Sequence, residues 1–114
     1  MVRLLNAAVM PVEGTYILRR LTPEAFERRL SDAFETGELH SSIGYPECQR
    51  MLAGLTGITV PLSRESTPVN DGDTLLICRL RYRVGNPALK SKVVATVDDY
   101  EFFVAAYSAE VASD

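Results

Sequence analysis

The sequence lacks the residue sets that most catalytic sites require. Its 114 residues include one histidine, so a histidine-based catalytic triad has a single candidate base, His40. The chain has no glycine-rich nucleotide-binding loop, no spacing typical of zinc ligands and no nucleophilic serine elbow. These absences leave most enzyme chemistries unsupported, and we expect neither a metal nor another cofactor.

An excess of basic residues is also missing. The chain has 12 lysine and arginine residues against 15 aspartate and glutamate residues, which gives a formal net charge of -3. A protein that coats duplex nucleic acid by bulk electrostatics needs the opposite balance. Any anion site must therefore be local, and we expect no duplex nucleic acid as a partner.

Cysteine is scarce. Cys48 and Cys78 lie far apart in the sequence, each among apolar neighbours and without the short spacing of metal sites. We interpret both as buried, reduced thiols.

No apolar run at the N-terminus is long enough to span a membrane. Pro11 and Gly14 interrupt this segment too early for a spanning helix or a usual signal peptide. We expect a cytoplasmic location, in a host cell or an infected one, and no membrane partner.

Length and residue pattern predict one domain that combines strands and helices. The chain is long enough for one core and too short for two, so residues 1–114 are expected to form a single domain. Residues 2–7 and 15–21 have the composition of strands. A helix is predicted to begin at Pro23 and end near Gly37. Its apolar face is expected to contain Phe26, Leu30, Ala33 and Phe34.

A second helix is predicted to begin within the stretch SSIGYPECQRMLAG. Ser42, Ile43 and Gly44 form a turn before Pro46, which suits the first position of a helix. The helix is expected to end at Gly57. Its free N-terminal amides and partial positive charge suit a phosphate group. Its buried face is expected to contain Cys48, Met51, Leu52 and Leu55.

One aromatic residue, Tyr45, stands between this turn and the second helix. Its ring can pack onto the helix as a hydrophobic staple. Alternatively it contacts a ligand, by stacking on a base or by hydrogen bonding to a phosphate. We favour the ligand contact because a helix N-terminus suited to phosphate begins at the next residue.

The C-terminal half is predicted to be rich in strands. Residues 58–62 can form a short strand, which Pro61 confines to an edge or an end. Residues 70–73 are expected to form a turn and residues 101–108 a final strand. Residues 74–84 form the most informative strand, because alternation separates an apolar face from a face with three arginines. The segment 84–99 is ambiguous between loop, short helix and strand. The first face contains Leu76, Cys78, Leu80, Tyr82 and Val84, and the second contains Leu75, Ile77, Arg79, Arg81 and Arg83.

The arginine row, Arg79, Arg81 and Arg83, has two interpretations. At about 6.6 to 7 Å between alternate side chains, it matches the spacing of successive phosphates in a nucleotide chain. The alternative is a solvated face whose arginines pair with acidic residues. The row alone favours the solvated face.

Several segments together resemble the viral anti-CRISPR ring nucleases of archaeal viruses, bacteriophages and some prokaryotic genomes. The resemblance covers nearly the whole chain in order and length. It rests on an opening strand ending in Leu5-Asn6-Ala7, on Ser42-Ile43-Gly44 before a helix, on a strand bearing Arg64, on a Gly-Asp turn before a strand ending in Arg83, and on Tyr-Glu-Phe-Phe at residues 100–103.

The resemblance implies both a fold and a reaction. The fold class is α/β or α+β, a single domain with a mixed β-sheet flanked by helices, assembled as a homodimer. The expected partner is cyclic tetra-adenylate, the second messenger of type III CRISPR defence, bound in a pocket across the dimer interface. In this family the ligand is cut without metal. A ribose 2′-hydroxyl attacks the adjacent phosphate, and a histidine protonates the leaving 5′-oxygen.

The family histidine directly follows Ser-Ile-Gly, and this chain has Tyr45 at that position. A phenol ionises at about pH 10 and an imidazole at about pH 6.5. Tyrosine can therefore donate a hydrogen bond at neutral pH, but it is a poorer general acid than histidine. Slow cleavage, or binding without cleavage, is therefore expected. His40, five residues earlier in the chain, is a possible substitute acid in either subunit; a surface histidine is the favoured interpretation.

Other matched positions are ligand contacts by resemblance. Asn6 would lie at the ligand near the end of the first strand, and Arg64 and Arg83 would hold phosphates. Arg79 stands where the family often has a polar amide, and Cys48 where it has a small hydroxylated residue. Further departures are Ala8, Val9 and Met10 in place of polar residues, and Asn86 in place of an acidic residue.

Three functions follow from the sequence. The favoured one is a slow ring nuclease that antagonises type III CRISPR signalling. A protein that sequesters a cyclic nucleotide without cutting it is the alternative. A regulator that binds duplex DNA ranks last, because the net charge is negative and no basic recognition helix is predicted.

Overall fold

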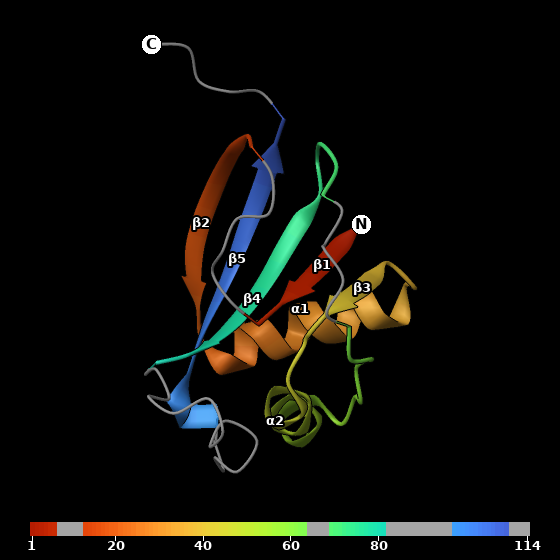
Figure 1. Ribbon diagram of the computed structural model, residues 1–114, viewed down its shortest axis with the longest axis vertical. Helices are drawn as coiled ribbons and strands as arrows, with labels where there is room; N and C mark the ends of the chain where they lie inside the picture. Colours follow the sequence, from red (N-terminus) through yellow and green to blue (C-terminus); the bar gives the residue numbers. More distant parts are fainter. Residues whose placement is uncertain (7–12, 64–68, 82–96, 110–114) are drawn as a thin grey trace.

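In the part of the chain that the structure describes, five strands and two α-helices build the fold (Figure 1). The computed structural model describes residues 1–6, 13–63, 69–81 and 97–109. The strands are β1 Val2–Leu5, β2 Thr15–Leu21, β3 Leu39–Ser42, β4 Thr74–Leu80 and β5 Tyr100–Ser108, and the helices are α1 Pro23–Glu35 and α2 Pro46–Thr56. Within the described ranges, no helix is long and apolar enough to cross a membrane.

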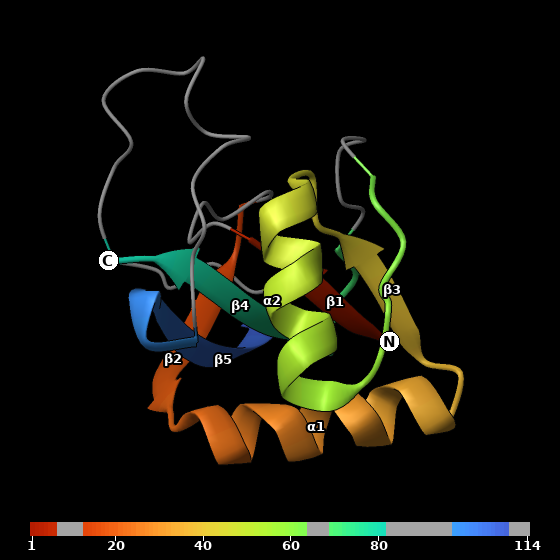
Figure 2. The ribbon, with the colours of Figure 1, turned by 90° about the horizontal axis from the view of Figure 1, so that it is seen from below.

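The strands form one mixed sheet in the order β2-β5-β4-β1-β3. β1 runs parallel to both β3 and β4, whereas β5 runs antiparallel to β2 and β4. Both helices lie against the same face of this sheet (Figure 2). The predicted fold class, a single α+β domain with a mixed sheet and flanking helices, is confirmed.

The two helices begin where the sequence predicts. The amide of Ala25 donates a hydrogen bond of 3.2 Å to the side chain of Thr22, which caps α1. α2 begins at Pro46 and ends before Gly57, whose φ of 75° is the left-handed conformation that glycine adopts without strain. Both predictions hold because capping residues and helix-terminal glycine are local signals.

The main core lies between the helices and the sheet. The rings of Phe26 and Phe102 contact each other at an interplanar angle of 45°, with their centroids 4.7 Å apart. Leu55 is partly buried and packs against the same core. Phe34, predicted to be in the core, is instead 53% exposed, because it lies roughly 80° around α1 from Phe26. The buried cluster contains Leu4, Phe26, Leu30, Ile43, Cys48, Met51, Leu52, Val60, Leu76, Cys78, Tyr100, Phe102 and Val104.

β3 is a strand that the sequence does not predict. Residues 39–42 form it by parallel pairing with β1, from Val2 opposite Leu39 to Leu5 opposite Ser42. Its four residues include two serines and no clear alternation, so only the partner strand defines it. The predicted strand at residues 58–62 is wrong, since this segment makes only an isolated bridge between Ile43 and Leu62.

The other strands differ from prediction at their ends. β1 ends at Leu5, two residues early, and β5 begins at Tyr100, one residue early. β4 ends at Leu80, where its pairing with Tyr100 also ends. Arg81 already forms a bend, so the predicted strand 74–84 is wrong there; residues 82–84 lie outside the described ranges.

The ambiguous segment 84–99 can be described only at its end. A 3-10 helix, Val97–Asp99, leads into β5 at Tyr100. The amide of Arg81 donates a 2.8 Å hydrogen bond to the carbonyl of Asp99. Because this turn starts β5, the pairing between β4 and β5 ends at Leu80 and Tyr100 in the part of the chain that is described.

Candidate functional site

The carboxyl ends of three parallel strands meet at one edge of the sheet, here called the carboxyl edge. β1 lies between β3 and β4 and runs parallel to both, so Asn6, Ser42 and Arg79 all lie at or near this edge. α2 begins at the same edge, shortly after β3 ends. Ligands of open sheets commonly bind outside the carboxyl ends of parallel strands. The carboxyl edge is therefore the candidate site.

The turn before α2 is held by hydrogen bonds to a neighbouring segment. The hydroxyl of Ser41 donates to the carbonyl of Pro61 at 2.8 Å and accepts from the amide of Ile43 at 3.4 Å. The amide of Ser63 donates to the carbonyl of Ile43 at 2.8 Å. Ser63 is the residue before Arg64, which itself lies outside the described residues. The backbone that leads into Arg64 therefore lies beside the turn.

Tyr45 occupies the N-cap position of α2. Its backbone is extended, with φ of -121° and ψ of 130°, and its carbonyl accepts a 3.2 Å hydrogen bond from the amide of Gln49. Its side chain makes no capping hydrogen bond and Tyr45 is 39% exposed. The first amides of an α-helix lack intrahelical partners, and they carry the positive end of the helix dipole. Tyr45 thus stands where a phosphate would meet those amides.

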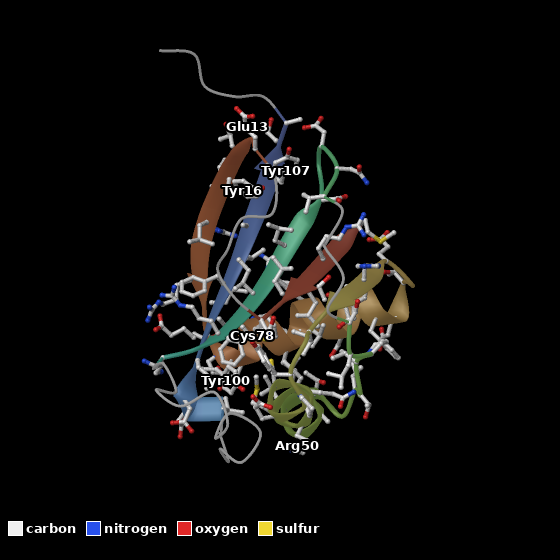
Figure 3. All side chains as sticks on the ribbon, in the orientation of Figure 1. Glu13, Tyr16, Arg50, Cys78, Tyr100 and Tyr107 are labelled. Atoms are coloured by element: carbon white, nitrogen blue, oxygen red, sulfur yellow. The ribbon has the colours of Figure 1, made fainter. Side chains whose placement is uncertain are left out.

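Four polar or titratable side chains lie buried beneath this helix start. We call Glu47, Cys48, Cys78 and Tyr100 the buried polar cluster; all are at most 6% exposed. The Sγ atoms of Cys48 and Cys78 are 3.4 Å apart, and Cys78 Sγ lies 3.6 Å from the carbonyl oxygen of Leu5. Figure 3 shows Cys78 and Tyr100 close to the α2 end of the sheet.

Burial shapes the chemistry of this cluster. The hydrogen bond with Cys48 and burial together raise the pKa of the Cys78 thiol well above its ordinary value. Burial also raises the pKa of Tyr100, and the neighbouring Cys48, Cys78 and Glu47 add to that effect. The hydroxyl of Tyr100 and the Oε2 atom of Glu47 have no hydrogen-bond partner among the residues that the structure describes.

Both cysteines are free and buried, as the sequence predicts. Their proximity was not predicted, because they lie 30 residues apart on different elements. The thiol of Cys48 lies in the core, so a ligand at the carboxyl edge would meet its backbone amide and not its side chain.

Three of the predicted site residues lie on the sheet face away from the helices. Alternation places Arg3 and Leu5 on that face, opposite to the core residues of β1. His40 is paired with Arg3 and Ser42 with Leu5, and Arg79 shares this face with the apolar residues of β4. A ligand at the start of α2 would have to pass over the carboxyl edge to reach these side chains.

Arg79 has partners on its own face. Its guanidinium lies 5.2 Å from the ring centroid of Phe103, and its Nη2 atom lies 3.7 Å from Glu101 Oε2. Arg20 on β2 also forms an ion pair with Glu101. For Arg79 these contacts fit the solvated-face interpretation of the arginine row.

His40 lies on β3. It lines a cavity of about 440 Å³ at the outer side of this edge strand, together with Pro61 and Ser63. Its register with Arg3 places its side chain on the sheet face away from the helices. Within one subunit, His40 and the start of α2 therefore lie on different sides of the sheet.

Glu47 is the residue at this site that the sequence reasoning did not single out. It is only 6% exposed although it is charged and lies in the first turn of α2. A signal was present, since Glu47 stands four residues before Met51 and eight before Leu55, which places it on the buried face. Of the positions that the sequence singles out, Arg64, Arg83, Asn86 and the segment 8–10 lie outside the described residues.

Comparisons with known proteins agree with this architecture. A family model described as STIV B116-like matches residues 2–101. Among solved structures, the chain is similar to B116 of Sulfolobus turreted icosahedral virus, with a TM-score of 0.73 and 21% sequence identity. The similarity covers 91% of this chain and 97% of the viral chain. At this identity the likeness shows the fold alone, and no curated protein sequence matches the chain.

Proposed function

The chain belongs to the STIV B116-like family, and from this premise we propose that it binds a cyclic oligoadenylate in a pocket shared by two subunits of a homodimer. The preferred ligand is cyclic tetra-adenylate, which the protein cleaves slowly without metal. This activity antagonises type III CRISPR signalling in the cytoplasm of the host cell. The identity of the ligand rests on the resemblance to the anti-CRISPR ring nucleases.

The observation that carries the proposal is the arrangement at the carboxyl edge. Asn6 follows β1 there, and the turn from Ser42 to Gly44 leads directly into the start of α2. The turn is fixed by its hydrogen bonds to residues 61–63. A rigid turn followed by a helix N-terminus supplies backbone donors for a phosphate without further reorganisation.

The proposed reaction needs one proton donor at this position. The ribose 2′-hydroxyl loses its proton to water as its oxygen attacks the adjacent phosphorus, the bond to the 5′-oxygen breaks, and that oxygen takes up a proton. Tyr45 is the exposed donor at the helix start. A phenol donates a hydrogen bond to the phosphate readily, but it transfers its proton poorly at neutral pH. Binding is therefore favoured over turnover.

Sequestration without cleavage is the second candidate function. The presence of Tyr45 in place of the family histidine favours it. Incubation with radiolabelled cyclic tetra-adenylate separates the two functions, because retention and cleavage are followed in the same samples. Retention with slow appearance of linear product supports the nuclease, and retention of intact ring supports sequestration. Absence of retention would overturn both.

The first prediction concerns assembly. A cyclic ligand with twofold symmetry fits an isologous interface, so we expect a homodimer at tens of micromolar protein. Light scattering coupled to size-exclusion chromatography measures the mass with and without ligand. A monomer under both conditions would contradict the shared pocket.

The second prediction concerns the arginines. Arg64→Ala and Arg83→Ala should each weaken ligand binding by about 1.5 to 3 kcal/mol, the range for hydrogen bonds to charged groups. Arg79→Ala is the matched control, because it removes a guanidinium group that lies on the sheet face away from the helices. This substitution should change affinity by less than about 1 kcal/mol. Titration calorimetry measures affinity, and thermal unfolding verifies the fold. Unchanged affinity for Arg64→Ala and Arg83→Ala would assign both to a solvated surface.

A further inference from the structure

The contact between Cys48 and Cys78 links the start of α2 to the centre of the sheet. Their Sγ atoms lie 3.4 Å apart, and the two residues are 2% and 0% exposed. Cys48 belongs to the first turn of α2, and Cys78 lies on β4 beside the carbonyl of Leu5. The same two elements frame the carboxyl edge.

The geometry permits a disulfide with little movement. A disulfide requires a distance of about 2.05 Å between sulfur atoms, so the two sulfurs must approach by roughly 1.3 Å. We expect the approach to combine rotation of the two side chains with a shift of the first turn of α2. No bond joins them in the present state, because both thiols are free.

We propose that Cys48 and Cys78 are a reversible redox pair, and that their disulfide draws the start of α2 toward β4 and weakens phosphate binding at the carboxyl edge. The oxidant is a peroxide. One thiolate attacks a peroxide oxygen, which breaks the O–O bond and gives a sulfenic acid and, for hydrogen peroxide, water. The second sulfur then displaces the sulfenic oxygen, which leaves as water, and the S–S bond forms. Two thiols lose two electrons and two protons, and a dithiol reductant reverses the change.

The neighbourhood of the pair explains why the reduced form persists at neutral pH. Burial and the hydrogen bond with Cys48 raise the pKa of Cys78, which keeps the reactive thiolate scarce. Glu47 from α2 and Tyr100 from β5 lie in the same cluster and provide no cation that would stabilise a thiolate. Oxidation is therefore expected to be slow and to need a sustained excess of peroxide.

Oxidation would act directly on the ligand contacts. The amides at the start of α2 belong to the same turn as Cys48. A displacement of about 1 Å is enough to take a hydrogen bond out of its favourable range. The effect on affinity rests on the proposed function, whereas formation of the disulfide does not.

The test uses the full-length protein treated with hydrogen peroxide. We expect the intact mass to fall by about 2 Da, with both cysteines protected from alkylation in denaturant. The melting temperature should rise by about 5 to 15 °C, because the bond closes a long loop of the unfolded chain. Affinity for cyclic tetra-adenylate should fall at least about tenfold, because one charge-assisted hydrogen bond to the phosphate is lost. Dithiothreitol should restore all three properties.

Cys78→Ala is the matched control, since it removes one sulfur from β4 and leaves α2 unchanged. It should bind like the reduced wild type and show no peroxide response in melting temperature or affinity. Thiols that stay open to alkylation in peroxide-treated wild type would overturn the proposal, as would a disulfide that changes neither melting temperature nor affinity. If reduced protein retains no ligand, the proposed function fails, and mass and melting temperature still decide whether the redox pair exists.

Discussion

Replacing Asp73 with alanine is expected to lower the free energy of unfolding by about 3 to 5 kcal/mol, the usual effect of removing one partner of a buried ion pair. Asp73 Oδ2 lies 3.2 Å from Arg3 Nε, and both residues are buried. The same carboxylate accepts a 2.8 Å hydrogen bond from the amide of Asn70 and lies 3.5 Å from the amino group of Met1. Without the carboxylate of Asp73, the guanidinium of Arg3 would be a buried charge without this opposite charge beside it.

The pH dependence of stability gives an independent readout. Burial opposes ionisation of Asp73, but the hydrogen bond from Asn70 and the charge of Arg3 outweigh it and lower the pKa. A carboxyl whose folded-state pKa is depressed stabilises the fold above its unfolded value of about 3.9, and this contribution is lost as the pH falls through the folded pKa. The difference in unfolding free energy between wild type and Asp73→Asn should therefore shrink below about pH 4.

Denaturant unfolding at several pH values measures both effects. Asp71→Asn is a suitable control, because Asp71 lies in the same turn and is exposed, so its substitution should change stability by less than about 1 kcal/mol. Asp73 precedes β4 and lies at the opposite end of the sheet from the carboxyl edge. Ligand affinity of folded Asp73→Asn should consequently equal that of the wild type. Equal free energies of unfolding for Asp73→Asn and Asp71→Asn would refute the role of the buried ion pair.

Local signals account for the parts of the fold that the sequence predicted. The bounds of β2 and the starts of both helices follow from turns, caps and alternation that neighbouring residues determine. β3 could not be predicted in this way, because its four polar and apolar residues become a strand only through pairing with β1. The early end of β4 has a similar cause, since the start of β5 limits its pairing.

The same difference between local and long-range determinants applies to the candidate site. The turn from Ser42 to Gly44 and the helix start at Tyr45 and Pro46 are consecutive in the chain, so their sequence predicted their arrangement. Which sheet face a residue occupies depends on register with a distant strand. For that reason the sequence could not reveal that Arg79 lies away from α2, or that Cys48 contacts Cys78.

The substitution Tyr45→His is expected to raise the rate of cyclic tetra-adenylate cleavage by about 10²-fold or more. General acid catalysis contributes typically about 10² to 10⁴-fold, and imidazole ionises much closer to neutral pH than a phenol. The backbone at Tyr45 is extended, a conformation that histidine adopts without strain. The position is 39% exposed, so a smaller ring can be accommodated without creating a core cavity. Affinity should change far less than rate.

Two companion variants and a pH profile identify the acid. Tyr45→Phe removes the hydroxyl and should reduce affinity and residual cleavage modestly, because one hydrogen bond to the phosphate is lost. In Tyr45→His, single-turnover cleavage should decline as the pH rises above about 6.5, since the imidazole must be protonated to act as the acid. His40→Ala should leave cleavage by wild type and by Tyr45→His intact, because the side chain of His40 lies on the sheet face away from α2. Flat turnover in Tyr45→His together with lost cleavage in His40→Ala would instead assign the acid to His40 of one subunit acting on a ligand held by the other. If none of the three variants changes binding or cleavage, Tyr45 does not contact the ligand, and the start of α2 is not the cleavage site.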